Sequence, residues 1–106
     1  MNNETGLLEA AVVGKYCIIR GNDFGVFAGT VESVDGDRAL VKDARRLWYW
    51  DGAASLSQLA AEGVTNPDGC KFTVTVDSIL LFGVIEIIPA TEKAKTIIEK
   101  VLAWKR

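Results

Sequence analysis

The densest group of side chains able to bind a ligand lies near the middle of the chain, where two arginines precede three aromatic residues: Arg45, Arg46, Trp48, Tyr49 and Trp50. In an extended strand alternate side chains share a face, so Arg46, Trp48 and Trp50 would lie on one face and Arg45 and Tyr49 on the other. Aromatic rings stack on nucleobases, and a guanidinium binds phosphate bidentately. The segment therefore predicts a pocket for a nucleotide-like ligand, served by at most one of the two arginines.

A short helix is predicted directly after this segment. Ser55 is the expected N-cap, Gln58 completes a capping-box pattern, and Gly63 suits the left-handed residue that ends a helix. The first N–H groups of the helix, with the hydroxyls of Ser55 and Ser57, would be available to hold an anion. Strand and helix together would then close around one phosphorylated ligand.

Two other interpretations of the aromatic segment remain open. Aromatic residues favour strands, so one face of the segment would belong to the core, with an arginine stacked on a tryptophan as an internal cation–π pair. Alternatively, the segment would form a subunit or partner interface, since Trp, Tyr and Arg are enriched in binding hot spots.

The chain contains few of the residues that usually carry out catalysis. The chain has no histidine, which removes the usual general base and the usual metal ligand, and two cysteines are too few for a zinc site. The stretch GNDFGVFAG lacks the spacing of a phosphate-binding loop. Asp35 and Asp37 flank a hairpin signal, and a carboxylate pair formed by Asp43 and Asp51 is the remaining catalytic alternative. We expect a non-enzymatic protein with no cofactor and no metal.

Net charge and cysteine content restrict the possible binding partners and the expected cellular compartment. Twelve Lys and Arg against fourteen Asp and Glu give a net charge of −2, which argues against non-specific nucleic-acid binding. Cys17 and Cys70 are distant in sequence and predict free thiols in a reducing cytoplasm. The longest apolar run, 79–84, is too short to span a bilayer, and residues 1–10 carry no secretory leader pattern, so we expect no membrane insertion.

Hydrophobic periodicity predicts an α+β fold in one domain over residues 1–106, with 1–13 as a loosely ordered lead-in. The fold would be a small, mostly antiparallel sheet or partly open barrel of five to six strands, with one short inserted helix and a C-terminal helix. The strands are expected at 15–20, 26–34, 38–42, 45–50, 71–76 and 79–88, the last broken at Gly83. Thr91 would cap the C-terminal helix, with Ala94, Ile97, Ile98 and Val101 facing inward.

Three Trp and four Phe are more aromatic surface than so short a chain easily buries. Together with the apolar run in 79–88, this predicts a homo-oligomer, most simply a dimer.

Several blocks carry a family resemblance: ARRLWYWDGAASLSQLA, the following EGV, and the later KFTVTV and VIEIIPATEKA. Over roughly residues 14–95 the chain resembles a family of small proteins of unknown function encoded by tailed phages and prophages. The resemblance implies an accessory phage protein in a bacterial cytoplasm and assigns no active site. By analogy with other small phage proteins, it would counter host defence by sequestering a nucleotide-like signal. The alternative is an inhibitor of a host protein, or a virion-associated interaction module, that uses the same aromatic patch.

Overall fold

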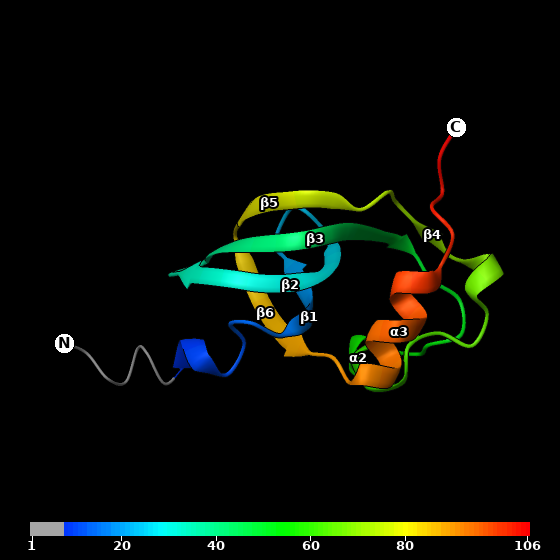
Figure 1. Cartoon of the computed structure of the whole chain (residues 1–106), viewed down its shortest axis with the longest axis horizontal. Helices are drawn as coiled ribbons and strands as arrows, with labels where there is room; N and C mark the ends of the chain where they lie inside the picture. Colours follow the sequence, from blue (N-terminus) through cyan, green and yellow to red (C-terminus); the bar gives the residue numbers. More distant parts are fainter. Residues whose placement is uncertain (1–7) are drawn as a thin grey trace.

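The computed structural model describes residues 8–106 and confirms the α+β prediction. In this part of the chain the strands are β1 (Tyr16–Gly21), β2 (Val26–Asp35), β3 (Arg38–Tyr49), β4 (Lys71–Phe72), β5 (Val76–Phe82) and β6 (Val84–Pro89). They are joined by α2 (Leu56–Glu62) and a 3-10 turn (Pro67–Gly69), and α3 (Glu92–Lys100) follows them. The strands form one open antiparallel sheet in the order β4-β3-β2-β1-β6, with β5 also paired to β3 (Figure 1).

The predicted third and fourth strands are one continuous strand, β3, so the prediction of a break between 42 and 45 was wrong. The partner strand explains the continuity: Ala28 pairs with Arg45 and Thr30 with Lys42, so two residues of β3 lie opposite Gly29 alone. This is a β-bulge, in which Asp43 has a positive φ of 50°. A Cβ on Gly29 would stand 2.9 Å from the carbonyl oxygen of Lys42, so the bulge needs a glycine opposite it.

The bulge also changes which β3 side chains share a face. Before it, Ala39 and Val41 point into the concave side of the curled sheet; after it, Ala44 does. Without the extra residue, strict alternation would have turned Arg45 to that side. The bulge instead turns Arg45 toward the helices and Arg46 toward the concave side.

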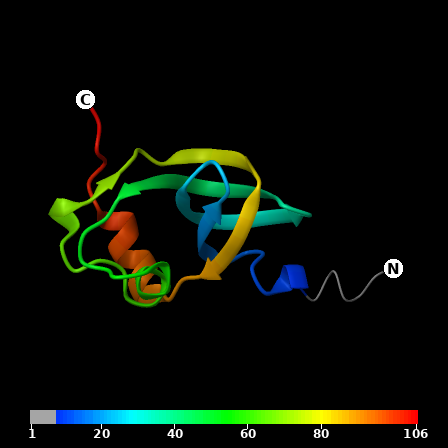
Figure 2. The same cartoon turned by 180° about the vertical axis from the view of Figure 1, so that it is seen from behind.

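Gly83 divides the predicted long strand 79–88 into β5 and β6, as expected. Its φ of 80° turns the chain, so that β5 pairs with β3 while β6 pairs with β1. One nearly continuous segment therefore runs along both borders of the sheet and curls it (Figures 1 and 2).

The predicted strand 71–76 was wrong beyond Phe72. Thr73 follows β4 with its amide bonded to the Arg46 carbonyl, and its side-chain oxygen accepts a hydrogen bond from the Arg46 amide. The side chain thus replaces a backbone partner, and the ladder with β3 resumes only at Val76.

Two groups of buried residues lie on the two faces of the sheet. The concave side holds Cys17, Ile19, Phe27, Val31, Ala39, Val41, Ala44 and Leu81. The other side packs against α2 and α3, which lie together at one end of the molecule (Figure 1). Both helices have their predicted caps: Ser55 accepts a bond from the Gln58 amide, and Thr91 accepts one from the Ala94 amide. Ala94, Ile98 and Val101 are buried as predicted, and Ile97 is partly buried.

Of the predicted lead-in, residues 1–7 lie outside the described part. Residues 8–10 form a single helical turn, and Val12 packs against the concave core. Cys17 and Cys70 are both buried and free, Cys17 in the concave core and Cys70 in the core against the helices. Within residues 8–106, no helix combines the length and apolar character needed to cross a membrane.

Candidate functional site

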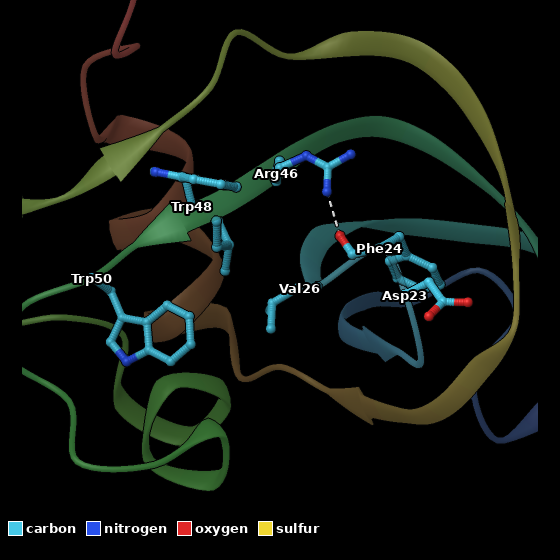
Figure 3. A pocket seen from close by; sticks show the side chains of 8 residues that line it. Asp23, Phe24, Val26, Arg46, Trp48 and Trp50 are labelled. Carbon is cyan, nitrogen blue, oxygen red and sulfur yellow. Dashed lines mark hydrogen bonds between the residues drawn. The ribbon is translucent and has the colours of Figure 1, made fainter.

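A pocket of about 410 Å³ opens where the end of β3 faces the β1–β2 loop (Figure 3). One wall comes from β3 and the residue after it, and the other from the loop and the start of β2. The lining residues are Asp23, Phe24, Gly25, Val26, Arg46, Leu47, Trp48 and Trp50.

The β1–β2 loop is held in position by its own backbone. The Gly21 amide donates to the Gly25 carbonyl at 2.9 Å, and Gly25 has a φ of 81°, which few other residues adopt at low cost. The Asn22 amide donates to the Gly83 carbonyl at 2.9 Å, so the corner of the sheet also supports the loop. The wall that carries Asp23 is thus anchored at both of its sides.

Arg46 joins the two walls. Its Nη1 donates a hydrogen bond to the Phe24 carbonyl, and its guanidinium carbon lies 4.4 Å from the centre of the Phe27 ring. Phe27 is its cross-strand partner, which explains the stacking. In the described part of the chain no carboxylate pairs with Arg46. The side chain is therefore fixed in place, and N–H groups not used by the Phe24 carbonyl remain for a ligand.

The two tryptophans of the pocket differ in exposure. Trp48 is 64% exposed, so most of its ring is open to a ligand or partner. Trp50 lies just beyond β3 and packs partly against the core beneath the helices. Figure 3 shows both rings at the same side of the pocket, with Val26 between them and the loop. Arg46, Trp48 and Trp50 therefore line one pocket, although Trp50 reaches it from beyond the end of β3 and Leu47 lines it as well.

Arg45 lies elsewhere, in the core between β3 and α3, and is 4% exposed. Its guanidinium donates to four backbone carbonyls, those of Phe72, Thr73, Ile98 and Val101. Burial lowers the pKa of this guanidinium, and in the described residues no carboxylate offsets that cost. Of the two arginines, Arg46 lines the pocket and Arg45 supports packing.

The remaining predicted site residues are not part of the pocket lining. Tyr49 is 53% exposed and pairs with Lys71 of β4. The Ser55 hydroxyl is used in capping α2, and Ser57 is an exposed residue of that helix. The structure thus separates the helix start from the Arg46 pocket, and the two do not enclose a common ligand site.

The sequence prediction missed the loop residues of the pocket. Asp23 and Gly25 lie between two predicted strands, and nothing local connects them to β3. The signal that would have found them is the β2–β3 register: pairing Phe27 with Arg46 places the residues before Phe27 beside the residues after Arg46.

Asp23 and Arg46 are the charged residues of the lining. In the described part of the chain, no three His, Cys, Asp or Glu side chains gather as a metal site would require. Asp43 lies at the bulge and Asp51 bonds the Asn66 amide, so the two do not face one another across the pocket.

Fold and pocket define a small α+β protein with a preformed aromatic pocket that contains one arginine and one aspartate. The chain belongs to a family described as a domain of unknown function (DUF6948), whose model matches residues 14–98. The resemblance to a family of unknown function is thereby confirmed. No curated protein matches the chain.

Proposed function

We propose that this protein binds, without transforming it, a nucleotide-like ligand that combines a planar ring with an anionic group. The observation that carries the proposal is that Arg46, Trp48 and Trp50 line one pocket. The rings supply stacking surface, worth about 1–3 kcal/mol per base in single-stranded complexes. The guanidinium, held by the Phe24 carbonyl and the Phe27 ring, supplies a positioned cation for the anion.

The size of the pocket supports a small ligand. Small-molecule sites range over about 300–1,000 Å³, and this pocket, at about 410 Å³, is near the lower end. A single nucleotide suits it better than a cyclic dinucleotide. The phage setting implied by the sequence resemblance agrees with a role in sequestering such a signal, and we include that role in the proposal.

The test is a thermal-shift screen of nucleotides, followed by calorimetry on the variants. A ligand at 100 times its dissociation constant stabilises the fold by about 2.7 kcal/mol. Arg46→Ala should weaken binding about 10- to 150-fold, because it removes a charge-assisted contact. Arg38→Ala is the matched control: it removes an arginine from the same strand, where it pairs with Asp35 away from the pocket.

Trp48→Ala should also weaken binding, and Trp104→Ala, which removes a tryptophan outside the pocket, should not. Wild-type affinity in both Arg46→Ala and Trp48→Ala would contradict the proposal. So would a screen in which no nucleotide stabilises the wild-type protein.

A second candidate function, interaction with another protein chain, is favoured by a different surface. Val76, Leu80 and Phe82 alternate along β5 and are 41%, 51% and 61% exposed. In the described residues β5 pairs on one side only, with β3, so its other edge is open. Natural edge strands usually carry charges or proline that prevent pairing. In β5 Asp77 is the single charge and Ser78 the one polar residue of the row, so the part from Ile79 to Phe82 is apolar throughout.

We propose that this row is the surface of the homo-oligomer predicted from sequence. Light scattering at tens of micromolar should show a dimer or larger species, and Leu80→Glu should reduce it to monomer. The exposed residue Glu62, replaced by Lys, provides a control on α2. A wild-type monomer at that concentration would contradict the oligomer proposal and leave the pocket proposal standing.

A further inference from the structure

We propose that Asp23 makes the pocket selective for a ribonucleoside with at most one phosphate, by accepting hydrogen bonds from the ribose hydroxyls. The inference rests on the proposed function and specifies its ligand. It comes from a residue of the β1–β2 loop that the sequence prediction did not include in the site.

The two charged side chains of the lining are not paired with each other. Asp23 and Arg46 line the same pocket but form no ion pair, whereas Arg20 and Arg38 each pair with a carboxylate. Within the described residues, the Asp23 carboxylate accepts no side-chain hydrogen bond either. Asp23 is exposed, and in Figure 3 its carboxylate lies beyond Phe24 at the rim of the pocket, so acid and base are separate and both are available to a ligand.

The pocket is aromatic at one end and charged toward the other. Figure 3 shows Trp48 and Trp50 at one side and Asp23 at the other, with Val26 and the guanidinium of Arg46 between them. A base stacked at the tryptophans would direct its sugar and phosphate past Val26 to the charged side. The ligand's planar and polar parts are therefore matched by separate ends of the site.

The carboxylate of Asp23 limits which ligand groups can bind beside it. An ionised aspartate only accepts hydrogen bonds, so the group that it binds must donate. Beside an arginine that binds the anion, the natural neutral donors of a nucleotide are the 2′- and 3′-hydroxyls. Acidic residues bind ribose hydroxyls in this way in dinucleotide sites.

The net charge of the pocket lining limits how many phosphates the ligand can carry. One arginine and one aspartate leave the lining without excess positive charge. Arg46 can offset one unit of the charge of about −1.5 to −2 on a terminal phosphate, but every additional phosphate would be repelled by Asp23 without a further cation in the lining. The site therefore favours monophosphates over triphosphates.

The test compares nucleotides that differ by one group. Calorimetry on the full chain would use the four ribonucleoside 5′-monophosphates, their 2′-deoxy counterparts, and ATP. The wild-type protein should bind its best ribonucleotide about 10-fold more tightly than the 2′-deoxy form, as expected for a hydrogen bond to a charged acceptor. ATP should bind more weakly than AMP.

Substitution of Asp23 should remove both preferences. Asp23→Ala should bring the ribose-to-deoxyribose ratio close to one, and Asp23→Asn should reduce the discrimination against ATP. Asp37→Asn, in the β2–β3 turn, is the control for loss of one surface charge and should keep both preferences.

Three outcomes would overturn the inference. Equal binding of ribose and deoxyribose forms by the wild type would do so, provided that Arg46→Ala still abolishes binding; the proposed function would then survive. A changed base preference in Asp23→Ala, with the ribose preference kept, would show that Asp23 contacts the base instead. Absence of Arg46-dependent binding by every nucleotide would overturn both proposals.

Discussion

Replacing Arg45 by methionine should destabilise the protein strongly, although methionine is apolar and similar in length. Arg45 is a buried cation whose partners are all backbone carbonyls, from β4, the residue after it, and the end of α3. It therefore connects the sheet to the C-terminal helix. Methionine would fill the space but offer those carbonyls no donor.

The expected loss of stability depends on which of the four carbonyls keep another hydrogen-bond donor. The Phe72 carbonyl still accepts from the Trp104 amide, and the Ile98 carbonyl still accepts from the Val101 amide. In the described structure the carbonyls of Thr73 and Val101 have no such second donor. Each buried carbonyl left unpaired costs about 1–3 kcal/mol.

Removing an unpaired buried charge offsets part of this loss, because burial disfavours the charged guanidinium. We therefore expect a net loss of about 2–4 kcal/mol, or roughly 10–25 °C in Tm for a domain of this size. Urea unfolding followed by tryptophan fluorescence measures the free energy directly. Arg38→Met on the same strand removes an exposed ion pair and should change stability by about 0.5 kcal/mol or less. If Arg45→Met unfolds within about 0.5 kcal/mol of wild type, the carbonyls do not depend on this side chain and the reasoning fails.

Three further predictions concern single positions. Gly52→Ala should cost about 2 kcal/mol or more, because φ there is 96° and a Cβ would stand 2.6 Å from the Thr65 amide nitrogen; an unchanged melting curve would contradict this. Thr91→Ala should cost about 1 kcal/mol by removing the acceptor for the Ala94 amide, measured by urea unfolding against Thr75→Ala. Burial raises the pKa of Cys17 from 9.0 to about 11, so the unfolded thiol ionises first and stability should fall as pH rises from about 9 to 11. The fall should be smaller in Cys17→Ala, where Cys70 and Tyr16, whose pKa values are also raised by burial, still contribute; an unchanged fall would contradict this.

Local signals predicted much of this fold. The helix from Leu56 was identified from Ser55 and Gly63, which act within a few residues of chain and cap it as expected. The C-terminal helix was likewise predicted from Thr91 and an apolar spacing that depends only on helical geometry. Gly83 was expected to interrupt a strand, and it does.

The errors arose where pairing with a distant strand decided the outcome. Asp43 ends no strand, because Gly29 on β2 leaves space for a bulge opposite it. The alternation of 71–76 suggested a strand, but the Thr73 side chain takes the place of a backbone partner there. Neither effect has a signature within its own segment.

Three of the residues singled out from the sequence, Arg46, Trp48 and Trp50, line the pocket, and its other wall was not predicted. Alternation correctly placed Arg46 with Trp48 and apart from Arg45, although a bulge that the sequence did not reveal determines which face each occupies. Asp23 entered the site only through the pairing of β2 with β3. The sequence identifies side chains able to bind a ligand. The residues that lie opposite them across the pocket are determined by the register between β2 and β3, which the sequence does not reveal.

The corner at Gly83 has a consequence for the rate of folding. Because β6 pairs with β1, the first and last strands of the sheet are neighbours, and the sheet is complete only when nearly the whole chain is ordered. Closing so long a loop costs entropy before its contacts form, and folds dominated by such distant pairings fold slowly, in milliseconds to seconds. During synthesis on a ribosome, β1, β2 and β3 would emerge as a meander whose two borders are both open. The apolar residues of Val84–Pro89 are needed to cover one of them, so the interval before they emerge is the time of greatest exposure to aggregation.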